Sequence, residues 1–93
     1  ILERSSRILP REEEDAAAIV HQSLVDEGVT ILVNSTAIRA ESIDGVKSML
    51  VRQNGNELRL EWDAVLLGVG RVPNLDGLEL ENADVEFTDA GVT

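Results

Sequence analysis

The residues best placed to contact a ligand lie late in the sequence. Residues 65–69 form an apolar run that contains Gly68, and Gly70, Arg71, a proline and an asparagine come soon after. A continuous apolar run is typical of a strand buried on both faces of a parallel sheet, and α/β proteins bind ligands beyond the carboxyl ends of such strands. Because glycine carries no Cβ, the backbone at Gly68 and Gly70 lets a ligand approach closely. The sequence therefore predicts a strand followed by a ligand-binding loop.

Composition excludes several classes of partner and chemistry. The 93 residues make at most one small domain, and the net charge of −10 repels nucleic acids and anionic membrane surfaces. No apolar run is long enough to span a bilayer and no secretory signal pattern opens the sequence, so we expect a cytoplasmic protein without a membrane partner. The absence of cysteine excludes a disulfide or a thiol nucleophile within these residues.

The predicted loop needs a scaffold, and the first third of the sequence predicts one built around a helix. Pro10 suits the first helical turn, because the N–H that it lacks has no helical partner there. The acids at 12–15 complement the positive end of the helix dipole. Gly28 is expected to end the helix as its C-cap. The predicted apolar stripe of this helix consists of Ala16, Ala17, Val20 and Leu24.

A strand is predicted on each side of this helix. Residues 1–3 resemble the end of one strand, with Glu3 at its terminus, and the largely β-branched residues 29–33 form the second. A crossover of this kind makes the two strands parallel, so Glu3 and Asn34 are expected at the same carboxyl edge of the sheet. The abrupt start within a strand indicates a piece of a longer chain.

A three-stranded antiparallel meander is predicted next. An Asp-Gly pair at 44–45 and an Asn-Gly pair at 54–55 are strong signals for tight hairpin turns, and they separate segments at 38–43, 46–52 and 57–62. Apolar and charged residues alternate in the third segment, which gives the sheet one buried and one exposed face. The tryptophan that ends this segment is expected to pack in the core. Beyond the meander and the apolar run, the acidic C-terminal part is expected to form a loop and a short strand.

The order of these features resembles the pyridine nucleotide–disulfide oxidoreductase family. The strand end at 1–4, the helix end at 26–29, the two glycine hairpins and the apolar run at 66–74 occur in the order and with the spacing of that family. The most specific element is the Gly-Arg-Val-Pro-Asn sequence at 70–74, directly after the apolar run. The similarity covers essentially the whole chain.

The resemblance implies an α/β fold that is a partial Rossmann-like NAD(P)-binding domain. Residues 1–74 would form the C-terminal part of that domain, with the strand–helix–strand unit, the meander and a final parallel strand, and residues 75–93 would begin the return to an FAD domain. The first βα unit, whose glycine-rich turn holds the pyrophosphate, is expected upstream of residue 1. Without that neighbour the isolated fragment is expected to be inactive, to expose strand edges, and to be marginally stable or to associate.

The resemblance also implies cofactor-binding roles around Glu3. Its carboxylate would accept hydrogen bonds from the adenosine ribose hydroxyls, whereas the residue type alone indicates only a solvated acid at a strand end. Arg4 and Arg7 match the geometry of a 2′-phosphate, and both are equally ordinary as loop solubilisers. Because the carboxylate repels that phosphate, NAD is expected in preference to NADP. NADP is the alternative cofactor.

Three further positions are implied to face the cofactor. The backbone of Ala37 would pass beside the adenine, and Gly70 would pack against the nicotinamide side, although a glycine required for its φ angle explains that residue equally. Arg71 would lie close to the cofactor or pair across the boundary to the FAD domain. No catalytic residue and no metal site is expected, because His21 has no second ligand nearby and the acids at 12–15 point in different directions on the helix.

Two functions from different classes follow. The first is the NAD(P)H-binding portion of an FAD-dependent oxidoreductase that passes hydride from NAD(P)H to FAD and on to a disulfide or related acceptor. Its expected partners are the nicotinamide dinucleotide and the rest of the parent flavoprotein, which is expected to be a homodimer. The alternative is a non-catalytic α/β binding or assembly module that has lost the cofactor site.

Overall fold

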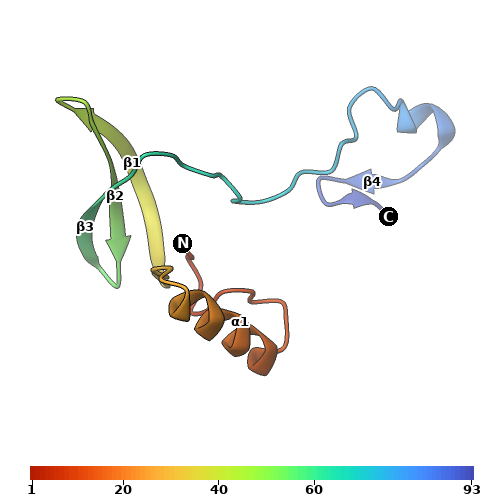
Figure 1. Ribbon diagram of the computed structural model, residues 1–93. Helices are drawn as coiled ribbons and strands as arrows, with labels where there is room; N and C mark the ends of the chain where they lie inside the picture. The colour runs from red at the N-terminus through yellow and green to blue at the C-terminus, as the bar shows by residue number, and fades with distance from the viewer.

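An extended segment joins two separately folded parts of the chain (Figure 1). The computed structural model describes all residues from 1 to 93. One part holds a helix and a three-stranded sheet, and the other holds a small hairpin, so the mixed α/β class expected from the sequence is confirmed. The elements are α1 (Glu14–Asp26), β1 (Ser35–Ile43), β2 (Val46–Gln53), β3 (Asn56–Glu61), a 3₁₀ helix (Leu80–Ala83), β4 (Phe87–Thr88) and β5 (Gly91–Val92).

The larger sheet is the predicted antiparallel meander, with strand order β1-β2-β3. Both hairpin turns have positive φ at their two central residues, with 52° and 80° at Asp44 and Gly45. The corresponding angles are 49° and 82° at Asn54 and Gly55. Positive φ at both positions is typical of the type I′ turn, whose twist matches that of the adjoining strands. Half-buried and exposed residues alternate in β3, which confirms the predicted two-faced strand.

Helix α1 begins at Glu14, which is later than the sequence predicts. Pro10 lies in a turn before the helix. The guanidinium of Arg7 donates hydrogen bonds to the carbonyl oxygens of Leu9, Pro10 and Glu12. The Leu9 carbonyl oxygen also accepts from the N–H of Glu12 at 3.1 Å, which closes a turn, and the helix starts beyond this turn.

The predicted end of α1 at Gly28 is confirmed. Gly28 has a φ of 93°, and its N–H donates to the carbonyl oxygen of Val25 at 3.0 Å. The N–H of Val29 donates to the carbonyl oxygen of Leu24, also at 3.0 Å. These two bonds form a Schellman motif, in which glycine adopts the left-handed conformation without a Cβ clash.

The predicted apolar stripe of α1 is only partly correct. Ala17 is buried and Leu24 is half-buried, but Ala16 and Val20 are exposed. The half-buried His21 lies on the inward face instead, because it follows Ala17 by one turn.

The two strands predicted around α1 are reduced to a single parallel bridge between Leu2 and Leu32. Here the N–H of Glu3 donates to the carbonyl oxygen of Leu32, and the N–H of Leu32 donates to that of Ile1, both at 2.9 Å. Beyond the bridge, the N–H of Asn34 donates to the carbonyl oxygen of Ser5 at 2.9 Å. The ends of both segments therefore lie at one edge, as predicted.

The predicted strand at 65–69 is wrong. No backbone hydrogen bond involves residues 63–74, and Leu66, Val69 and Val72 are 97%, 91% and 90% exposed. An apolar segment becomes a strand only where a second strand supplies hydrogen-bond partners, and none lies beside this one (Figure 1). The structure therefore lacks the final parallel strand of a Rossmann-like domain.

The acidic C-terminal part forms its predicted short strand slightly later than expected, at β4 instead of 85–87. This strand pairs with β5 through Phe87 opposite Val92 and Thr88 opposite Gly91.

The hydrophobic core is small. The buried apolar residues are Ile8, Ala17, Leu50 and Val51, and Val51 alone is completely inaccessible. The radius of gyration is 18.3 Å, against about 12 Å for a compact chain of this length. Trp62, expected in the core, is only half-buried. None of the helices combines the length and the apolar character that a membrane-spanning helix requires.

Candidate functional site

Glu3 lies where the two chain segments of the parallel bridge end. Its N–H donates to the carbonyl oxygen of Leu32, and its own carbonyl oxygen accepts a 3.0 Å hydrogen bond from the N–H of Ser35. Ser35 is buried and is the first residue of β1. The backbone of Glu3 is therefore hydrogen-bonded both to the segment of the parallel bridge and to the first residue of the meander. The half-buried side chain of Glu3 is therefore presented at the carboxyl edge predicted from the sequence.

The Glu3 carboxylate is hydrogen-bonded through one of its two oxygens. Oε1 accepts from the backbone N–H of Ser5 at 3.0 Å and from the Ser5 hydroxyl at 2.8 Å. These bonds, with a smaller contribution from the charge of Arg4, lower the pKa of the Glu3 carboxyl below its ordinary value. The second oxygen, Oε2, has no hydrogen-bond partner. Glu3 thus offers a charged acceptor at the edge of the fold.

The two arginines beside Glu3 differ in availability. Arg7 is occupied by the loop, because its guanidinium donates to three backbone carbonyl oxygens at 2.8, 3.2 and 2.9 Å. Arg4 is exposed, and its guanidinium makes no hydrogen bond or ion pair. The structure therefore leaves Arg4, and not Arg7, as the free guanidinium next to Glu3.

A β-bulge marks the position of Ala37. Ala37 lies opposite Val51, but Arg39 lies opposite Leu50, so the intervening Ile38 has no partner on β2. A bulge leaves backbone groups outside the ladder and bends the strand. The family resemblance implies that the backbone of Ala37 passes beside the adenine. The bulge directly after Ala37 was not predicted from the sequence.

Gly70 and Arg71 are not brought to Glu3. Both lie in the extended segment without backbone hydrogen bonds, and both are exposed. Gly70 has a φ of 155°, and no atom lies within 4 Å of the position that a Cβ would occupy there. In Figure 1 this teal segment runs from the sheet towards the C-terminal hairpin and away from the N-terminus.

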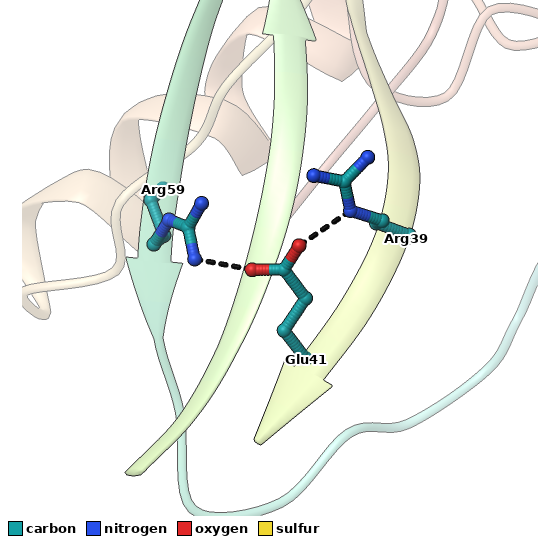
Figure 2. A network of polar contacts seen from close by, with 3 residues as sticks. All are labelled: Arg39, Glu41 and Arg59. Atoms are coloured by element: carbon teal, nitrogen blue, oxygen red, sulfur yellow. Dashed lines mark hydrogen bonds and ion pairs between the residues drawn. The ribbon is translucent and has the colours of Figure 1, made fainter. Parts of the chain in front are cut away.

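A polar network that the sequence analysis missed covers the central strand of the meander (Figure 2). The carboxylate of Glu41 on β1 accepts hydrogen bonds from Arg39 on the same strand and from Arg59 on β3. Both arginines lower the pKa of the Glu41 carboxyl, with the hydrogen bond from Arg39 as the largest cause. Glu41 lies opposite the buried Ser48 of β2. Only the strand register, which pairs Arg39 and Arg59 with the same β2 residue, reveals this cluster.

A shallow hollow lies at the opposite end of the meander from Ser35. The ammonium of Lys47 lies 5.5 Å from the centre of the Trp62 ring, and the backbone N–H of Trp62 donates to the Lys47 carbonyl oxygen at 3.1 Å. The indole Nε1 is buried without an acceptor. No group of three His, Asp or Glu side chains converges here or elsewhere in a metal-binding arrangement. The hollow is lined by Gly45, Val46, Lys47, Glu61, Trp62 and Asp63.

Comparison with known proteins decides the family. The sequence model of the pyridine nucleotide-disulphide oxidoreductase family matches residues 1–93. The chain belongs to this family. Among its relatives, the dihydrolipoyl dehydrogenase of Bacillus subtilis (strain 168) is 34% identical over 92 residues, which are 99% of this chain and 20% of that protein. The family resemblance inferred from the sequence is therefore confirmed.

Two further relatives show the same pattern. The dihydrolipoyl dehydrogenase of Geobacillus stearothermophilus is 35% identical over 99% of this chain and 20% of its own length. The mercuric reductase of Lysinibacillus sphaericus is 31% identical over 92% of this chain and 16% of its own length. The chain thus spans about a fifth or less of the curated relatives that it matches.

Proposed function

We propose that this chain is part of the NAD(P)H-binding domain of an FAD-dependent oxidoreductase. In the parent protein, hydride would pass from NAD(P)H to FAD, and electrons would then reach a disulfide or a related acceptor. The observation that carries the proposal is the Glu3 carboxylate, which is held at a carboxyl edge with Oε2 unpaired. The chain itself supplies binding groups and no catalytic residue.

The chemistry of Glu3 fits the ribose of a dinucleotide. A carboxylate with a free oxygen accepts hydrogen bonds from the 2′- and 3′-hydroxyls, and hydrogen bonds to a charged acceptor are stronger than neutral ones. The same negative charge repels a 2′-phosphate, so the proposed cofactor is NADH ahead of NADPH. Arg4 moderates that preference, because its guanidinium is free to pair with a phosphate.

The remaining proposed contacts depend on the rest of the parent protein. Residues 1–74 would complete the NAD(P)-binding domain when an upstream strand lies between residues 1–3 and residues 65–69. Gly70 would then face the nicotinamide side of the site, and the bulge beside Ala37 would lie near the adenine. Arg71 would lie close to the cofactor or pair across the boundary to the FAD domain. Residues 75–93 would return to the FAD domain of a homodimeric flavoprotein.

Removing the charge of Glu3 tests the proposal. In the full-length protein, Glu3→Gln is expected to weaken NADH binding about ten- to a hundredfold, because one charged hydrogen bond contributes about 1.5–3 kcal/mol. Glu13→Gln is the matched control, since Glu13 is an exposed acid whose side chain makes no capping bond. Fluorescence titration with NADH measures both. Equal affinity in the two variants would favour the alternative, an α/β module without a cofactor site.

A further inference from the structure

We infer that Ser5 is a positioning residue for Glu3, which holds one carboxylate oxygen so that the other is presented to a ribose hydroxyl. The inference rests on the proposed function and adds a residue to it. Ser5 makes no proposed contact with the cofactor, so its effect would be transmitted through the orientation of the Glu3 carboxylate.

Two donors of Ser5 contact the Glu3 carboxylate. Its N–H and its hydroxyl both donate to the same oxygen of Glu3, at 3.0 and 2.8 Å. Two donors from one residue fix the rotation of the carboxylate group, which a single hydrogen bond leaves free. Neither Ser5 donor occupies Oε2, which is left to accept from a ligand.

The backbone of Ser5 is fixed in turn. Its carbonyl oxygen accepts a 2.9 Å hydrogen bond from the N–H of Asn34, at the end of the second segment of the parallel bridge. Ser5 is also half-buried, unlike its neighbour Ser6. Ser5 therefore links the Glu3 carboxylate to Asn34, which follows α1 in the chain.

The hydroxyl of Ser5 has a second acceptor. Its Oγ lies 2.8 Å from the carbonyl oxygen of Arg7 as well as 2.8 Å from Oε1 of Glu3. A hydroxyl has one hydrogen, so it donates to one acceptor at a time. When a second ribose hydroxyl donates to Oε1, the Ser5 hydrogen can turn to Arg7 without losing a hydrogen bond. Ser5 thus suits a carboxylate that must serve two adjacent hydroxyls.

The test compares serine variants in the full-length protein. Ser5→Ala is expected to weaken NADH binding about fivefold and to raise the pKa of the Glu3 carboxyl towards its ordinary value, since a donor to the charged form is lost. Ser5→Thr keeps the hydroxyl and is expected to restore both. Ser6→Ala is the matched control, because the exposed Ser6 makes no hydrogen bond. NADH titration gives the affinity, and carboxyl ¹³C NMR without cofactor gives the pKa, which lost stability alone does not move.

The outcomes separate the two proposals. If Ser5→Ala matches Ser6→Ala in both readouts while Glu3→Gln loses affinity, the role of Ser5 is overturned and the proposed function stands. If Glu3→Gln also binds NADH like the wild type, the proposed function fails and the role of Ser5 fails with it. Should Ser5→Ala not fold, Ser5→Cys replaces it, because the thiol is a weak donor of similar size and is expected to lower affinity in the same direction.

Discussion

The backbone N–H of Ser35 donates a 3.0 Å hydrogen bond to the carbonyl oxygen of Glu3, although helix α1 separates the two residues along the chain. This bond continues the parallel pairing that begins at the bridge between Leu2 and Leu32. It places the acid of the first segment beside the start of the meander. The candidate site is therefore built by the return of the chain after α1, and it requires both ends of the crossover.

Cofactor preference is expected to depend on the charge of Glu3. In the full-length protein, kcat/KM is expected to be higher for NADH than for NADPH, and Glu3→Ala is expected to narrow that ratio, because the carboxylate no longer repels the 2′-phosphate. Steady-state kinetics with both cofactors measures the ratio, and Glu13→Ala controls for the loss of one negative charge at an exposed position outside the site. Equal efficiency with the two cofactors in the wild type would contradict this view.

The parts of the fold that could be predicted are those whose determinants are local. The hairpins at Asp44-Gly45 and Asn54-Gly55 and the helix end at Gly28 each depend on glycine adopting positive φ, which the residue type itself indicates. The strand at 65–69 failed because a strand also needs a partner, and apolar character does not supply one.

The candidate site was predictable only in outline. The place of Glu3 follows from the parallel crossover. The hydrogen bonds that Arg7 donates to loop carbonyl groups, and those that Ser5 donates to Glu3, depend on loop geometry that no residue pattern encodes. The network of Arg39, Glu41 and Arg59 was missed for a related reason. These residues meet because a bulge shifts the register of β1 after Ala37.

The hairpin glycines are expected to contribute to stability through backbone conformation alone. Gly55→Ala places a Cβ at a φ of 82°, where no atom lies within 4 Å, so only the left-handed strain of about 1–2 kcal/mol is expected. Gly68→Ala is the control, since a Cβ at Gly68 also has no atom within 4 Å but the φ of Gly68 lies outside the left-handed region. Urea unfolding of the full-length variants gives the free-energy differences. Similar losses at both positions would show that the turn conformation is not the cause.

The network around Glu41 is expected to stabilise the meander in a salt-dependent manner. Glu41→Gln leaves Arg39 and Arg59 facing each other without a shared anion, so Tm is expected to fall. The fall is expected to shrink in about 1 M salt, where the Debye length is about 3 Å. Glu57→Gln breaks the longer, exposed pair with Arg52 at 3.6 Å and should have a smaller effect. A salt-independent fall in Tm would indicate lost packing instead.

Stability is expected to decrease as the pH falls through the range in which Glu41 and Glu3 are protonated. Both carboxyls have a pKa below the ordinary value of 4.5. The unfolded chain therefore binds protons first, and the stabilisation is fully present above about pH 4.5 and is lost as the pH drops through the folded-state pKa. Urea unfolding at several pH values measures the slope. Glu41→Gln should flatten it, whereas Glu61→Gln, which removes an acid outside the ion pairs, should not. Parallel curves for Glu41→Gln and the wild type would count against the mechanism.

The extended segment is expected to cause self-association of the isolated chain. Residues 63–74 carry unpaired backbone groups, and Leu66 and Val69 are almost fully exposed, so the segment can pair with another chain as an open strand edge does. Sedimentation velocity should show concentration-dependent oligomers, and a double Leu66→Lys, Val69→Lys variant should shift the distribution towards monomer. Ile19→Lys is the control, because Ile19 is 72% exposed on α1, where the helix satisfies the backbone. If Ile19→Lys were as effective as the double variant, association would depend on apolar surface in general and not on the unpaired strand.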